Sequence, residues 1–392
     1  MFKLFNNEKD RKYILTLITV MLIFKILGSM FVGYYCKRGK TQKGLVFRDK
    51  RVIEQKKLSP TLLALGYHWD SIHYVNTSMY WGENFRKAGQ LRNFAYIYPL
   101  SIMILGKVIG SNILAAVILS NLFSILAAIA FYFVCRIYMT QEKSFSAAVI
   151  LSIYPAFFVS GLIAYAEPMF LFFAILSWYY FEKENYLISA VLAGLCLCTR
   201  TAGAIIIPIY FVIFLYRIIS SSWKEKKIVL PKAVCLWYLI PIVFLIAQVL
   251  ITKYFVSSAG FRTNSFAGSM PRINAHFVPV FSPVLQLKQI MKNIPQALEL
   301  YMYLLPAILL AVYLKKFRWE LFIYAAIAIF SVMSISETEV FRAIPRHLLN
   351  AWPVFISLGD FLKNRYLLLV VSVFFFMVGL MMLHNFYTFL YI

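Results

Sequence analysis

Long apolar runs with almost no charge follow one another along most of this chain. Eleven of them suggest membrane spans, at 13–36, 112–138, 145–163, 168–181, 186–199, 202–217, 233–255, 298–314, 321–336, 347–361 and 366–390. A helix that crosses a bilayer needs about 20 apolar residues, and its backbone groups must be hydrogen-bonded within the helix. We therefore expect an all-α, polytopic transmembrane helical bundle that forms a single integral membrane domain over residues 1–392.

The composition excludes the main alternatives. Hydrophobic residues make up 61% of the 392 residues, and charged residues only 14%, against about 25% in a soluble domain. This excludes both a soluble globule and a disordered chain. The net charge of +23 is explained by anionic lipid headgroups and by the excess of basic residues in inner loops. The expected partner is therefore the lipid bilayer, and no nucleic acid is expected.

The basic residues also predict an orientation. With the N-terminus inside and 13–36 as a retained signal anchor, 17 Lys and Arg fall on the short inner segments, and only Arg200, Arg342 and Arg346 fall on the short outer connections. Basic groups resist translocation, so this orientation is favoured over its mirror image. The segment 37–57, with nine basic residues on the outer side, argues against it.

Two long loops, 37–96 and 256–297, would then face outside, and we expect them to carry interfacial helices. Ser59-Pro60 is a helix-start signal, and the aromatic residues that follow suit the membrane interface. The apolar piece 94–110 is either interfacial, re-entrant or a short span. The five cysteines show neither a disulfide nor a zinc spacing, and we find no nucleotide-binding or serine-hydrolase motif.

Asp70 is one of only four aspartates, and it lies in the stretch His68-Trp69-Asp70-Ser71-Ile72-His73. In a helix, Asp70 and His73 share a face. A carboxylate near the membrane surface can act as a general base; the alternative is a helix cap. The two histidines and Asp70 offer ligands for a divalent metal ion, but no established ligand spacing occurs and we expect no metal or other cofactor.

Three further groups combine charge with apolar surroundings. Glu167 precedes Pro168 and suits either a helix cap or a site. Arg200 lies between two apolar segments, where an ionisable residue indicates function unless it extends to the interface. Arg342, Arg346 and His347 precede the tenth predicted span; their side chains could bind phosphate or face lipid headgroups.

Taken in order, these stretches resemble the PIG-V-type mannosyltransferases, which are membrane glycosyltransferases of the GT-C superfamily. The resemblance rests on HWDSIHY at 68–74, YWGEN at 80–84, FAYIYP at 94–99, YPAF at 154–157, YAE at 165–167, TRTAG at 199–203 and PRH at 345–347. It departs from the family pattern in the aromatic run, which lacks the double Phe and double Pro, and in Ala166, where the family has a hydroxyl residue.

The resemblance implies an inverting transfer of a sugar, mannose in this family, from a polyprenyl-phosphate donor to a hydroxyl of a glycan or lipid-glycan acceptor. Asp70 would be the general base, and Glu167 would orient the acceptor. The implied substrate- or phosphate-binding residues are His73, Glu83, Arg200, Arg342, Arg346 and His347. The implied location is the outer face of a bacterial cytoplasmic membrane. A transporter or flippase for a lipid-linked or anionic solute is the alternative, and a non-catalytic scaffold is a third class.

Overall fold

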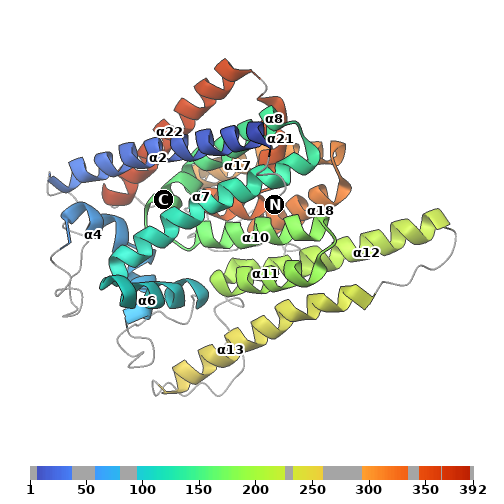
Figure 1. Ribbon diagram of the computed structural model, residues 1–392, viewed down its shortest axis with the longest axis horizontal. Coiled ribbons are helices and arrows are strands. Elements are labelled where there is room, and N and C mark those ends of the chain that lie inside the picture. Colours follow the sequence, from blue (N-terminus) through green and yellow to red (C-terminus); the bar gives the residue numbers. More distant parts are fainter. Residues whose placement is uncertain are drawn as a thin grey trace.

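The computed structural model describes residues 7–37, 58–79, 95–225, 233–258, 294–333, 344–362 and 364–388, and these contain helices and no strand (Figure 1). The α-helices are α2 (Glu8–Lys37), α4 (Pro60–Gly66), α5 (Asp70–Met79), α6 (Ile97–Ile109), α7 (Asn112–Tyr138), α8 (Gln141–Ile153), α9 (Pro155–Leu162), α10 (Glu167–Glu182), α11 (Tyr186–Thr199), α12 (Ile206–Glu225), α13 (Ile240–Ser258), α17 (Ile294–Tyr313), α18 (Trp319–Met333), α20 (Ile344–His347), α21 (Val354–Phe361) and α22 (Arg365–Thr388). Short 3-10 helices join several of them.

Several of these helices are able to cross a membrane. Within the described residues, four are long and apolar enough, at Glu8–Cys36, Asn112–Tyr138, Ala202–Trp223 and Arg365–Tyr387, and the bent pair α8 and α9 makes a fifth. Each of the eleven predicted spans lies largely on helix, but several of these helices are too short to cross alone. The described residues thus form an all-α structure with four or five helices able to cross a membrane, while the number of eleven spans stays a prediction.

The predicted span 145–163 is wrong as one continuous helix. It consists of α8 and α9, which are bent by 63° at Tyr154. The cause is local: Pro155 follows Tyr154, and a residue before proline is pushed out of the helical region. Tyr154 accordingly has φ −52° and ψ 126°, and Pro155 starts α9.

The predicted interfacial helix after Ser59 exists as two short helices, α4 and α5. Ser59 caps α4, because its hydroxyl accepts a hydrogen bond from the Leu62 N–H, and Pro60 stands in the first turn. The piece 94–110 contains α6, which has only 13 residues. Most of the second predicted loop, 256–297, lies outside the described residues, as do 38–57 and 80–94.

The helices pack around two buried clusters. α10 lies between α7 and α11, α8 packs on α7 and α21, and α22 covers α9 (Figure 1). The larger apolar cluster contains Phe131, Trp178 and Trp352. The smaller one joins α4, α5 and the α9–α10 connection, with Tyr165 in its interior. The candidate site lies at this second cluster.

Charged residues mark the opposite end of the bundle, which we name the basic end. Its ion pairs join Asp10 with Arg136, Asp360 with Lys143 and Lys316, and Glu182 with Arg217 and Arg318. These residues come from segments that the charge pattern assigns to one face of the membrane. The charged residues that the charge pattern assigns to the inner side therefore lie together at one end of the bundle.

Candidate functional site

Four charged residues from distant parts of the sequence form one network, named here the acid–arginine network. Asp70 Oδ2 accepts hydrogen bonds from Nη1 and Nη2 of Arg346, both at 2.9 Å. Arg346 Nε lies 2.7 Å from Glu167 Oε1, and Arg200 Nη2 lies 3.2 Å from the same oxygen. The network thus runs Asp70, Arg346, Glu167, Arg200, and it contains two carboxylates and two guanidinium groups.

Asp70 is positioned by a strained turn between α4 and α5. Trp69, directly before it, has φ 50°, which is unfavourable by about 1–3 kcal/mol for a residue other than glycine. The indole Nε1–H of Trp69 donates to the Phe386 carbonyl at 2.9 Å, and His68 Nε2 lies 3.2 Å from that same oxygen. These contacts with α22 hold the turn, so that α5 starts with Asp70.

Glu167 is fully buried at the start of α10, just after the connection from α9. Among the described residues, neither of its carboxylate oxygens has a partner in hydrogen-bonding geometry, although Arg346 and Arg200 lie within ion-pair distance of Oε1. The distances show a charge interaction, and the geometry leaves lone pairs unused. The capping alternative therefore has no backbone hydrogen bond to support it.

Arg200 lies at the predicted helix break. α11 ends at Thr199, Arg200 is extended with φ −151°, and a 3-10 turn follows. The turn packs so closely on α11 that a Cβ on Gly203 would come within 2.6 Å of the Cys196 carbonyl oxygen. Arg200 is only 8% exposed. Its guanidinium is thus turned toward Glu167 rather than out to the interface.

Arg346 and His347 come from α20, and the environment of Arg346 sets its charge. The Arg346 guanidinium lies over the Tyr165 ring, 4.8 Å from its centroid. Burial opposes the charge of Arg346, but Glu167 and Asp70 raise its pKa well above the usual value. His347 follows Arg346 directly in α20.

Two of the remaining predicted residues lie outside the described part of the chain, namely Glu83 and Arg342. His73 lies one turn beyond Asp70 in α5. Burial lowers the pKa of His73, and Asp70 opposes that shift. The structure thus brings Asp70, Glu167, Arg200 and Arg346 into contact, with His347 near both arginines and His73 near Asp70.

Three contributors to the network were not among the predicted site residues. Tyr165 stacks on Arg346, and the Phe386 carbonyl fixes the turn before Asp70. Tyr74 is buried close enough to Glu167 and Asp70 to interact with both charges. Tyr165 precedes Glu167 by two residues and belongs to the same YAE stretch, so the motif could have indicated it. A backbone carbonyl such as that of Phe386 leaves no mark in a sequence.

The side chains described around this network do not form a metal site. Within the part of the chain that the structure describes, no group of three or more His, Cys, Asp or Glu side chains is placed to hold a metal ion. His68 Nε2 faces α22 rather than Asp70. The described side chains instead suit an anion, because two arginines offer planar donor groups and Arg200 Nη1 has no hydrogen-bond partner among them.

Comparison of the chain with protein-family models, curated proteins and solved structures finds no match. The function therefore rests on the sequence motifs and on the geometry of the acid–arginine network.

Proposed function

We propose that this chain is a membrane glycosyltransferase of the PIG-V mannosyltransferase type. It would transfer mannose or a similar hexose from a polyprenyl-phosphate donor to an acceptor hydroxyl of a glycan or lipid-glycan, with inversion. The proposal includes the GT-C fold with about eleven spans and a site on the outer face of a bacterial cytoplasmic membrane.

One observation carries this proposal. Asp70, Glu167, Arg200 and Arg346 are spread over 277 positions of the sequence, yet ion pairs join them into one buried network. Each lies in a stretch that resembles a motif of the family. Ion pairs at the basic end join equally distant residues, so the support comes from the agreement between this network and the motif stretches.

Asp70 suits the role of general base. Its side chain is 35% exposed, so that it can reach a substrate at the edge of the network. Both hydrogen bonds from Arg346 go to Oδ2, and Oδ1 accepts none among the described residues. Oδ1 would take the proton of the acceptor hydroxyl as that oxygen bonds to the anomeric carbon, while the bond from this carbon to the donor phosphate breaks.

The charges of the network also balance over such a reaction. Two carboxylates face two guanidinium groups. When Asp70 takes a proton, the network loses one negative charge at the moment when the leaving phosphate gains one. Arg200 and Arg346 would then stabilise this phosphate in a site with little water.

The experiment is glycosyl transfer by the purified full-length protein in liposomes that contain polyprenyl-phosphate mannose, with products detected by mass spectrometry. We expect Asp70→Asn to lower transfer by about 10²–10⁴-fold, the range of a lost general base, with an unchanged thermal midpoint. Asp360→Asn, at the basic end, is the matched control and should keep its transfer rate. Transfer by Asp70→Asn within a few-fold of the wild type would refute the assignment.

The alternative of a transporter or flippase makes a different prediction in the same liposomes. It requires movement of the lipid-linked sugar between the two leaflets without any glycosidic product. Leaflet exchange that needs Asp70, with no product formed from any acceptor tested, would favour that alternative over the enzyme.

A further inference from the structure

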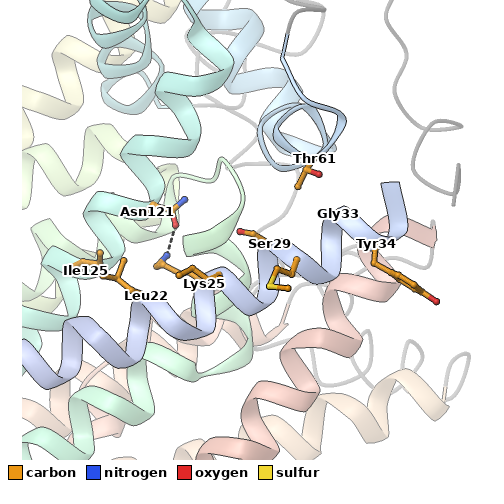
Figure 2. A pocket seen from close by; sticks show the side chains of 10 residues that line it. Leu22, Lys25, Ser29, Gly33, Tyr34, Thr61, Asn121 and Ile125 are labelled. Carbon is orange, nitrogen blue, oxygen red and sulfur yellow. Dashed lines mark hydrogen bonds between the residues drawn. The ribbon is translucent and has the colours of Figure 1, made fainter. Parts of the chain in front are cut away.

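A groove runs along α2 on a side away from the acid–arginine network. It has a volume of about 630 Å³ and lies between α2, α4 and α7, as Figure 2 shows. Its lining residues are Leu22, Lys25, Ile26, Ser29, Met30, Gly33, Tyr34, Thr61, Asn121 and Ile125. This volume falls within the range of small-molecule pockets, about 300–1,000 Å³.

The apolar part of the groove faces outward from the protein. Leu22, Ile26 and Met30 are exposed by 45%, 59% and 66% on α2, a helix that is long and apolar enough to cross a bilayer. They recur every four residues and so form one stripe along the helix. In a membrane this stripe lies against hydrocarbon chains.

A buried ammonium group lies in the same groove. Lys25 is 8% exposed, and its Nζ donates to Asn121 Oδ1 at 2.9 Å, as the dashed line in Figure 2 marks. It also donates to the Gly161 carbonyl at 2.6 Å. Both partners are neutral. An ammonium has three N–H donors, and the third has no acceptor among the described residues. Nor does any carboxylate in the described part of the chain pair with Lys25.

Polar side chains connect Lys25 with the end of the groove at α4. Ser29 and Tyr34 follow Lys25 along α2, and Thr61 of α4 meets α2 at Gly33. Gly33 lies eight residues after Lys25, which is about 12 Å along a helix. A polar headgroup that enters beside α4 would thus find hydroxyl groups on its way to the ammonium.

We propose that this groove binds an anionic phospholipid of the surrounding bilayer, such as phosphatidylglycerol. Its phosphate would pair with Lys25, and its headgroup would lie toward Ser29 and Thr61. One acyl chain would continue past Leu22, with Ile26 and Met30 against neighbouring lipids. A charged side chain within the hydrocarbon is unfavourable unless it is paired, and the phosphate supplies the missing counter-charge. The site does not depend on the proposed transferase activity.

The test is native mass spectrometry of the full-length protein, delipidated in detergent and titrated with phosphatidylglycerol or phosphatidylcholine. We expect the first phosphatidylglycerol to bind at least about fivefold more tightly than phosphatidylcholine, since one lysine near lipid is worth about 1 kcal/mol. Lys25→Gln keeps a donor for the Gly161 carbonyl but removes the charge, so the preference should vanish. Lys25→Arg should retain it.

Two further variants make the result specific. Lys107→Gln removes an exposed lysine elsewhere and should leave the preference unchanged. Ser29→Trp fills the groove without altering Lys25 and should abolish the first lipid adduct, so it tests the site even where Lys25→Gln fails to fold. An unchanged preference in Lys25→Gln, or in Ser29→Trp, would overturn the proposal. So would displacement of phosphatidylglycerol by polyprenyl phosphate that excess phosphatidylglycerol cannot reverse.

Discussion

Asp360 and Glu167 are both buried carboxylates, 3% and 0% exposed, at opposite ends of the helical bundle. At the basic end, Asp360 accepts hydrogen bonds from Lys143 at 2.5 Å and from Lys316 and Tyr313, both at 2.7 Å. In the acid–arginine network, Glu167 has two arginines within ion-pair distance but no partner in hydrogen-bonding geometry among the described residues.

The difference shows that burial of a carboxylate does not by itself identify a functional site. The chain itself satisfies the carboxylate of Asp360, which is what a structural ion pair requires. Glu167 retains unused lone pairs, as Arg200 retains an unused guanidinium nitrogen. Buried groups in this state are rare in proteins and need an explanation. At the basic end, Asp10 and Glu182 each leave one carboxylate oxygen without a hydrogen-bond partner among the described residues, whereas Glu167 leaves both. A bound substrate or ordered water would complete the hydrogen bonds of Glu167 and Arg200, and this supports the site proposed here.

The largest expected effect concerns Glu167→Gln. The change removes the buried carboxylate that pairs with Arg200 and Arg346, and breaking such a pair lowers the free energy of unfolding by about 3–5 kcal/mol. Chemical unfolding in detergent measures this loss. Glu184→Gln, on an exposed turn, is the control and should stay within about 0.5 kcal/mol of the wild type. Equal stability of the two variants would mean that the arginines do not depend on Glu167.

A smaller effect is expected from Arg346→Lys. Lysine keeps the positive charge but cannot reach Asp70 and Glu167 at once, because it lacks the planar group of donors. We expect glycosyl transfer per folded protein to fall by about 10²-fold, the effect of one lost electrostatic donor, with the thermal midpoint measured alongside to give the folded fraction. Arg318→Lys makes the same exchange at the basic end. The comparison fails if both variants lose transfer equally.

The smallest effect is expected from Asp360→Asn, with a loss of about 2 kcal/mol, the value of hydrogen bonds to a charged group. Chemical unfolding in detergent measures this loss, with Glu184→Gln again as the control. A free energy of unfolding equal to that of the wild type would mean that Lys143 and Lys316 do not depend on Asp360.

The sequence predicted the helical fold well, because apolar runs leave few other choices. It also singled out Asp70, Glu167, Arg200 and Arg346, whose charges stand out among apolar neighbours. The bend at Tyr154 was missed even though Pro155 was visible, since the apolar run continues across it. Several predicted spans agree closely with the observed helices, such as 112–138 with α7 and 186–199 with α11. Hydropathy marks burial and lipid contact, however, and does not show where a helix bends.

Other features could not be predicted from the sequence at all. Nothing in the composition of 22–34 shows that Lys25 would lie in a groove with Asn121. Pairing between residues so far apart depends on how α2 and α7 pack, and a single sequence does not fix this. The same holds for the Phe386 carbonyl, which any residue at that position would supply.

The hydrogen bond from Trp69 to residue 386 has a practical consequence for work on this protein. The turn before Asp70 depends on a backbone atom of α22. A truncation before residue 386 would remove this tether, and α4 and α5 would then be free to merge into one helix that turns Asp70 away from Arg346. Shortened forms of the protein for biochemical work should therefore keep α22 entire.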